Sequence, residues 1–250
     1  MKKAFRRKKL FIYILVKCLL LINIGCGIDV FLMIDSPEIV SNKPELGNTE
    51  YKNDYFEFYT NETGDTTFIG TSVYYKIYDS YDSTSPFSKE VGSLISIAND
   101  VENNYNAPYK LIDEDKYNYK QLLADGINSA TLIPYTGKNR KVYIRLSDYL
   151  GMEEYSAQIK VDDLPLNGEK TIPLRDIATK SSFNFTGTSE YNKIPASDDV
   201  DTKFSPTSQS NDVWYVAMFA VAVGKDTNYT PVYSNILYLG AVTIDKSMIN

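Results

Sequence analysis

The stretch that decides the fold reads Trp214-Tyr215-Val216-Ala217-Met218-Phe219-Ala220-Val221-Ala222-Val223. It is an almost unbroken apolar run, about as long as a strand, and it ends at Gly224. Such a run is typical of a central strand that is buried on both faces. Residues 225–230 are predicted to turn, and residues 232–244 to return as the final strand. The end of the chain therefore predicts a long β-hairpin.

The strongest strand in the first half covers residues 68–78. There Val73 and Tyr75 fall on one face while Tyr74 and Lys76 fall on the other, which is the two-residue period of a strand with one face buried. A composition of 21 Tyr and 11 Phe against 13 Gly and 10 Pro also favours strands. Further strands are expected over residues 28–34, 55–59, 130–134, 142–146, 157–161, 171–175 and 182–186.

The period changes to a helical one between about residues 80 and 129. Ser88 is the expected N-cap of a first helix, because apolar residues from Val91 to Val101 follow at helical spacing and predict a helix to Asn103. A second helix is expected over 114–124 with Asp113 as its cap. Residues from about 178 to 212 are rich in Ser, Thr, Asn and Asp, and after the short strand at 182–186 they predict a long exposed loop.

The closing hairpin resembles that of a fibronectin type III sandwich. Residues 215–223 and 233–239 look like the F and G strands of that fold, and residues 70–78 are similar to its C strand. The resemblance implies that 28–40 serves as A, 55–59 as B, and the strands between 130 and 175 as C′ and E. We therefore expect a mainly β protein with a fibronectin type III/immunoglobulin-like antiparallel β-sandwich. A plain module has about 90 to 100 residues, so the helical segment about 80–129 and the polar loop about 178–212 are expected to be insertions.

The start of the chain has the layout of an export signal. Six basic residues and no acid occur within residues 2–9, an apolar stretch follows, and the stretch ends at Gly25-Cys26. This pattern resembles a bacterial lipoprotein signal, in a loosened form with Asn23 that looks like the lipoproteins of spirochaetes. The resemblance implies cleavage between Gly25 and Cys26, a diacylglycerol group on the Cys26 thiol, and a place on a membrane of the bacterial cell envelope.

Two other interpretations of the signal stay open. The segment could act as an uncleaved anchor, although Lys17 divides its 15-residue apolar stretch and a comfortable span needs about 20 apolar residues. It could also be cleaved without lipidation, with Cys26 as an incidental thiol. The expected organisation is a signal over 1–25, an anchor and first-strand region over 26–50, and a single domain over 51–250. The whole arrangement resembles uncharacterised spirochaete envelope lipoproteins, and it does not identify a ligand, the membrane or the face that the body occupies.

Composition excludes several classes of chemistry. The chain contains no His, and its two Cys both lie within the first 26 residues, so Ser-His and Cys-His mechanisms are excluded for the body that follows. Without the seven basic residues of the signal, 19 basic residues face 32 acidic ones, a net charge of −13. A surface of that sign repels nucleic acid. The sequence contains no phosphate-binding loop and no dinucleotide fingerprint.

Acidic turns are the remaining candidates for chemistry. Calcium is the most reasonable cofactor to consider, because Asp113-Glu114-Asp115, Asp162-Asp163 and Asp198-Asp199-Val200-Asp201 gather hard oxygen ligands. None of them continues into an EF-hand loop, and we interpret them as solvated turns, with no metal site predicted. A carboxylate-only hydrolase needs just two acids that face each other, so the composition leaves that class open.

Tyrosines in or beside the helical segment are candidates for a contact surface, since exposed Tyr on a rigid support binds proteins or sugars well. The alternative, which we favour, is that they replace other residues at the rim of the core. The candidate residues are Tyr81, Tyr105, Tyr109, Tyr117 and Tyr119. The favoured hypothesis is a noncatalytic, lipid-anchored envelope protein that binds a protein or glycan partner or has a structural role. The alternative is a carboxylate-dependent carbohydrate- or peptide-processing enzyme. Two carboxylates that converge in a deep pocket would favour catalysis, and a tyrosine patch would favour binding.

Overall fold

The computed structural model describes residues 34–40, 43–47, 51–62, 67–149, 151–206 and 212–249. These residues belong to one compact unit that spans Met33–Asn250. Gly25, Cys26 and the rest of the expected signal lie outside the described residues, as does nearly all of the strand expected over 28–34. Among the residues described, no helix is both long and apolar enough to cross a membrane.

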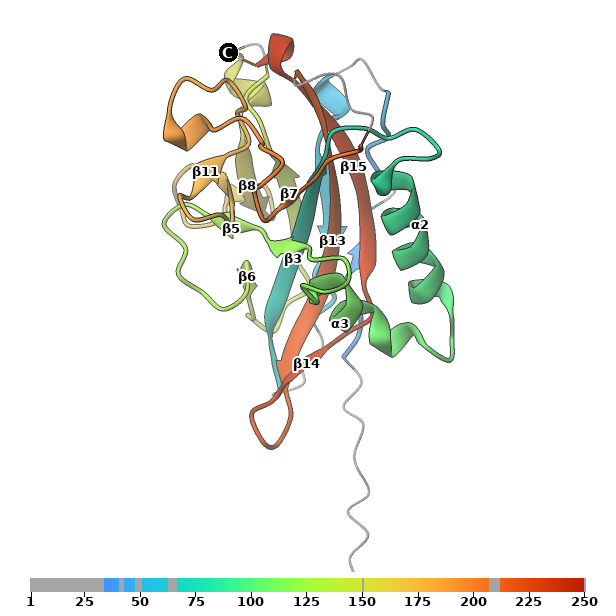
Figure 1. Cartoon of the computed structure of the whole chain (residues 1–250). Helices are drawn as coiled ribbons and strands as arrows, with labels where there is room; N and C mark the ends of the chain where they lie inside the picture. The colour runs from blue at the N-terminus through green and yellow to red at the C-terminus, as the bar shows by residue number, and fades with distance from the viewer. Residues whose placement is uncertain are drawn as a thin grey trace, which may run out of the picture. The chain divides into compact units, whose positions relative to one another are not determined.

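A large sheet is built around β3 (Phe68–Tyr78) and β13 (Val213–Lys225), which pair antiparallel along most of their length (Figure 1). The other side of β13 pairs with β15 (Leu237–Asp245) and β14 (Pro231–Tyr233). The other side of β3 pairs with three short strands, β4 (Lys120–Gln121), β6 (Ile133–Pro134) and, in parallel, β12 (Thr202–Lys203). The strand predicted over 68–78 and the closing hairpin are confirmed, with the returning strand divided between β14 and β15. The strand over 68–78 is buried on both faces and not on one as expected, since Lys76 and Tyr78 are buried as well.

A second sheet has the order β1-β2-β7-β8-β9 with antiparallel neighbours. Its strands are β1 (Glu38–Ile39), β2 (Phe56–Tyr59), β7 (Lys141–Arg145), β8 (Gln158–Val161) and β9 (Leu164–Pro165). A small third sheet joins β11 (Ser181–Ser182), β10 (Pro173–Arg175) and β5 (Leu123–Ala124). The protein is therefore mainly β with antiparallel sheets, as predicted, and the β12–β3 pair is a parallel exception.

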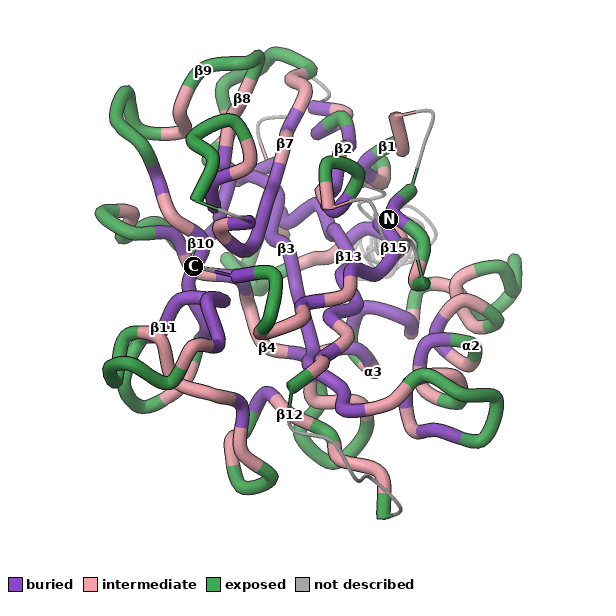
Figure 2. Tube along the Cα trace, turned by 90° about the horizontal axis from the view of Figure 1, so that it is seen from above, coloured by how far each residue is buried: buried purple, intermediate pink, exposed green. Residues whose placement is uncertain are grey.

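Alternate residues of the central strands face two different hydrophobic cores. Val73 and Val216 pack with Phe58 of the second sheet, whereas Phe219 packs with Leu94 on the helical side, and all five are fully buried. Figure 2 shows β3 and β13 buried between these two sides. The prediction that residues 213–223 form a strand buried on both faces is confirmed. Each large apolar side chain buried there contributes roughly 1.5–3 kcal/mol.

Two α-helices, α2 (Pro86–Asn99) and α3 (Ala107–Ile112), lie on the face of the large sheet that the second sheet does not cover (Figure 1). The N-cap of α2 is Ser85, whose side chain accepts a hydrogen bond from the Ser88 backbone N–H. The expected cap at Ser88 is thus three residues late. Pro86 explains the difference, because it fits the first helical position, where its missing N–H is not needed.

The helix expected over 114–124 is wrong. Asp113 follows α3, and its carboxylate accepts a hydrogen bond from the Asp115 backbone N–H, so it forms a turn and not an N-cap. Residues 120–124 then run extended as β4 and β5, with the Leu122 N–H bonded to the Val73 carbonyl. Pairing with the long β3 strand overrides the local helical preference. Five 3-10 helices complete the described structure: η1 (Tyr51–Asn53), η2 (Asn104–Asn106), η3 (Glu153–Tyr155), η4 (Glu190–Asn192) and η5 (Lys246–Met248).

Within the polar segment 178–212, the strand expected over 182–186 is observed only as β11 (Ser181–Ser182), and Phe183 and Phe185 after it are fully buried. The loop expected to follow is not exposed throughout, because Asp201 is also fully buried. Asp201 receives two hydrogen bonds from the buried Arg175 guanidinium, at 2.8 and 2.9 Å, and Asp199 receives a third at 2.9 Å. The acidic turn 198–201 was expected to be solvated, but it balances the positive charge of Arg175. A buried guanidinium without a counter-charge would cost several kcal/mol of folding free energy.

Candidate binding site

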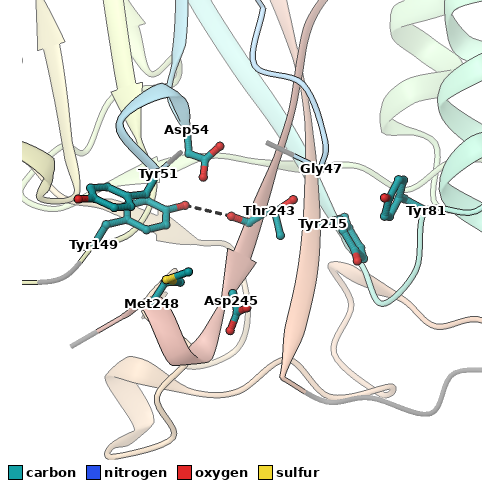
Figure 3. A pocket seen from close by; sticks show the side chains of 9 residues that line it. All are labelled: Gly47, Tyr51, Asp54, Tyr81, Tyr149, Tyr215, Thr243, Asp245 and Met248. Atoms are coloured by element: carbon teal, nitrogen blue, oxygen red, sulfur yellow. Dashed lines mark hydrogen bonds between the residues drawn. The ribbon is translucent and has the colours of Figure 1, made fainter. Parts of the chain in front are cut away.

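A pocket of about 190 Å³ lies beside β15 at one end of the large sheet (Figure 3). Its lining comes from segments that are far apart in the sequence, so that only the folded chain assembles it. The lining residues, which define what we call the β15-edge pocket, are Gly47, Tyr51, Asp54, Tyr81, Tyr149, Tyr215, Thr243, Asp245 and Met248.

The strand register fixes one wall of the pocket. Tyr215 of β13 and Thr243 of β15 are direct partners across the sheet, so their side chains lie on the same face. Tyr149, which follows β7, donates its hydroxyl to the Thr243 carbonyl at 3.1 Å. This hydrogen bond joins the segment after the second sheet to the edge of the first, and it holds Tyr149 rigidly in the wall.

Four tyrosines form two pairs around the pocket. Tyr51 and Tyr149 are stacked, with ring centroids 6.2 Å apart and planes 18° from parallel. Tyr81 and Tyr215 lie closer, at 4.6 Å with a tilt of 52°. Tyr149 is only 2% exposed whereas Tyr81 is 44% exposed. The first pair therefore supplies an inner aromatic wall, and Tyr81 forms part of the rim.

Arg145 lies behind the inner wall as a buried cation. Its guanidinium donates to the Tyr51 carbonyl at 2.7 Å, to the Lys52 carbonyl at 2.9 Å and to the Tyr143 hydroxyl at 2.8 Å. Four tyrosine rings, those of residues 55, 143, 149 and 155, surround it at 5.3–5.9 Å. These contacts fix η1 against β7, and among the described residues they hold Arg145 without a direct ion pair.

Asp54 is the most unusual group of the pocket. It is 5% exposed, and no hydrogen bond to its carboxyl group is present among the described residues. Burial raises the pKa of Asp54 to about 7, and the positive charge of Arg145 opposes part of that rise. Figure 3 shows the carboxyl group directed into the pocket. A buried acid without a partner destabilises the fold when it ionises, and a group that costs stability is a candidate for function.

The second acid of the pocket is arranged differently. Asp245 accepts hydrogen bonds from the Ser247 backbone N–H at 2.8 Å and from the Ser247 hydroxyl at 2.6 Å, and so caps η5. In Figure 3 Asp54 and Asp245 occupy opposite ends of the pocket, and their carboxyl groups do not converge. Between them lies Thr243, whose hydroxyl oxygen is buried without a partner among the described residues.

The five tyrosines predicted as a contact surface do not form one surface. Tyr81 is at the pocket rim, and Tyr105 and Tyr109 are exposed by 63% and 48% in the α3 region, where Tyr109 packs edge-on against Tyr233. Tyr117 is partly buried and shares a hydrogen bond with Ser93.

Tyr119 contradicts the prediction, because it is 2% exposed. Its hydroxyl lies 2.9 Å from the Tyr78 hydroxyl, which in turn donates to Glu90 of α2 at 2.9 Å. Lys76 on the same face of β3 forms an ion pair with Glu90 at 2.9 Å. Tyr119 therefore belongs to a buried network that fastens α2 to the large sheet.

The predicted cleavage and lipidation site, Gly25 and Cys26, lies outside the described residues. Within the described ranges, no three acidic, His or Cys side chains are gathered in a way that could hold a metal ion. Sequence reasoning missed Tyr51, Asp54, Tyr149 and Tyr215. The general abundance of Tyr was the only signal for the three tyrosines, and nothing near Asp54 in the sequence set it apart from the other acids.

The fold and the pocket together define a mainly β protein with a tyrosine-rich, acidic pocket at the end of its central sheet. Comparison of the chain with known protein families, with curated proteins and with solved structures finds no match. The function must therefore be argued from the residues themselves.

Proposed function

We propose that this protein is a lipid-anchored component of a bacterial cell envelope with a noncatalytic binding role, and that the β15-edge pocket is its binding site. The anchor is the Cys26 thiol, after cleavage at Gly25. Strand β1 begins at Glu38, so the chain from Cys26 to β1 could span at most roughly 40 Å. An acyl group on Cys26 would therefore keep the β body close to its membrane, on a face that the sequence leaves open.

Strand order supports kinship with the fibronectin type III sandwich. The neighbours β1-β2-β7 follow the order A-B-E of that fold, and β15-β13-β3 follow G-F-C. In this interpretation α2 and α3 belong to an insertion after the C strand, and that insertion covers a sheet face that a plain module exposes to solvent. In this proposal the protein is a fibronectin type III-like sandwich in which helices cover the outer face of one sheet and the β15-edge pocket lies at the end of that sheet.

The observation that carries the binding role is the composition of the pocket wall. Four tyrosines and one buried, unpartnered carboxyl group surround a small hollow, which is the mixture of apolar surface and few polar groups typical of ligand sites. The alternative, a carboxylate-dependent processing enzyme, has one supporting observation, the pKa of Asp54 near 7, which would suit a general acid.

That alternative also needs a second carboxylate across the reacting bond, at roughly 5–9.5 Å. Asp245 is the other acid in the lining, and both Ser247 hydrogen bonds go to its Oδ1 atom at the opposite end of the pocket. We therefore favour binding over catalysis. A hydrolytic activity that is lost both in Asp54→Ala and in Asp245→Ala would reverse this preference.

The anchor is tested by expression in a bacterium fed an alkyne-tagged fatty acid. The wild-type protein and Cys18→Ala are expected to take up the label and to sediment with membranes, whereas Cys26→Ala is expected to lose the label. Cys18 is a matched control, since it is the only other thiol of the chain. Equal labelling of Cys26→Ala and wild type, or an unlabelled wild-type protein in the soluble fraction, would contradict the proposed anchor.

A further inference from the structure

We infer that the β15-edge pocket binds a primary ammonium group carried on a short aliphatic stem, an inference that rests on the proposed binding role and names its ligand class. The ammonium would approach Asp54, and the stem would lie between the tyrosine rings. The source of the group could be a lysine side chain of a partner or a small free amine, which share this chemistry.

The charge of the lining favours a cation. Two of its residues are acids, and none is Lys or Arg. Arg145 is the cation whose charge acts on Asp54, and its hydrogen bonds to the Tyr51 and Lys52 carbonyls hold it behind the wall. Arg145 therefore lowers the negative potential of the pocket without occupying it.

Hydrogen-bonding capacity points to the same class of ligand. Asp54 is 5% exposed as a residue, and its carboxyl group faces the hollow and lacks a donor among the described residues. When ionised it can only accept hydrogen bonds. An ammonium has three donors and no acceptor, so it supplies what the carboxylate lacks, in a charge-assisted hydrogen bond.

The aromatic lining suits the stem and the charge together. A cation within about 6 Å of a tyrosine ring is attracted to the ring face, and methylene groups pack on the same surface. This chain already holds Arg145 in that way, with four tyrosine rings at 5.3–5.9 Å. Tyr149 belongs both to that group of rings and to the pocket wall.

Size limits how much of an extended ligand the pocket can enclose. The pocket volume of about 190 Å³ is below the range of roughly 300–1,000 Å³ that encloses drug-sized molecules. A head group with a few methylene groups fits such a space, while a chain of sugar rings does not. This selects the head group of a larger partner, or a small amine, over an oligosaccharide.

The test compares probes that differ in one group. Isothermal titration of the folded protein with n-pentylamine is expected to show binding at pH 8, whereas n-pentanol, of the same size but uncharged, and glucose are expected to show none. Asp54→Asn should weaken pentylamine at least tenfold, and Tyr81→Leu, at the exposed rim, several-fold. Asp198→Asn removes an exposed acid outside the pocket and should leave the affinity unchanged.

Two further arms identify the source and the pH dependence. A blocked Gly-Lys-Gly peptide that binds better than its norleucine analogue indicates a lysine side chain, and pentylamine binding without peptide binding indicates a free amine. Affinity should rise between pH 5.5 and 8 as Asp54 loses its proton. The charged and titratable groups around Asp54 are Arg145, Tyr51, Tyr149 and Asp245, and burial keeps the pKa of Tyr149 well above this range.

The inference is overturned if no amine binds, if pentanol or glucose binds as tightly as pentylamine, or if Asp54→Asn leaves the amine affinity unchanged. Circular dichroism of Asp54→Asn at pH 8, the pH of the titration, separates a lost site from a lost fold. Failure here is distinct from failure of the proposed anchor, because acylation of Cys26 is measured independently. A glucose complex in the pocket would preserve the binding role and reject the ammonium.

Discussion

Replacement of Asp201 by Asn is expected to destabilise the fold strongly, because it removes the principal counter-charge of Arg175. Both residues are fully buried. Asp201 accepts hydrogen bonds from Arg175 Nε and Nη2 through its two oxygens, at 2.9 and 2.8 Å, and from the Tyr75 hydroxyl at 2.7 Å. The neutral amide keeps the shape of the side chain, but it loses the charge and presents an NH₂ group to a donor.

The magnitude follows from the burial of the pair. Removal of one partner from a buried ion pair costs about 3–5 kcal/mol, since the other charge is left uncompensated. Asp199 still contacts Arg175 at 2.9 Å, which favours the lower half of that range. For a domain of this size each 1 kcal/mol lowers the melting temperature by about 2–4 °C. We therefore expect a loss of about 3–4 kcal/mol and a decrease of roughly 6–16 °C.

Urea titration and thermal melts followed by circular dichroism measure this change. Asp198→Asn, three residues away and exposed, is the matched control and should alter the free energy of unfolding by less than about 0.5 kcal/mol. Arg175→Met in the Asp201→Asn background should recover part of the loss, because the stranded charge is gone. Equal stability of Asp201→Asn and Asp198→Asn would refute the argument that this ion pair organises the segment 178–212.

Three further outcomes are expected. Asp54→Asn should stabilise the protein relative to wild type by about 1 kcal/mol or more at pH 8 and have little effect at pH 4. Burial raises the pKa of Asp54 in the folded state to about 7, so the wild type loses stability as the pH rises from about 4 to above 7. A difference in urea midpoints that does not change with pH would contradict this. Gly70→Ala should cost about 2–4 kcal/mol in the same assay, because a Cβ at this position, with φ +151°, would overlap the Thr131 hydroxyl and the Ile133 carbonyl oxygen. Gly92→Ala, in the exposed middle of α2 with open space around it, should instead raise stability by about 0.5–1 kcal/mol, and a loss there would show that α2 packs differently.

Local sequence was sufficient for the long elements. The two-residue period of 68–78 and the apolar run from Trp214 to Val223 predict β3 and β13, because strands of this length carry their burial pattern in consecutive residues. The helical spacing from Val91 onward predicts α2 for the same reason, although Pro86 and Ser85 place its start earlier.

Short strands and polar contacts depend on partners that lie elsewhere in the chain. Strands β4 and β5 have two residues each, too few to show a period, and they exist because β3 and β10 offer edges for pairing. The residues over 114–124 favoured a helix locally, and the prediction of a helix there was still wrong. Asp199 and Asp201 have the local sequence of a solvated turn. In the structure both form ion pairs with the buried Arg175, which lies 24 or more residues earlier in the chain.

The residue pattern alone was enough to predict a mainly β chain with a long closing hairpin. Folding was needed to show that both faces of the central sheet are covered and that Tyr51, Asp54, Tyr149 and Tyr215 meet at the edge of β15. This division arises because periodicity reports the burial of neighbours along one element. A pocket depends on which distant elements pack together, and no local pattern encodes that.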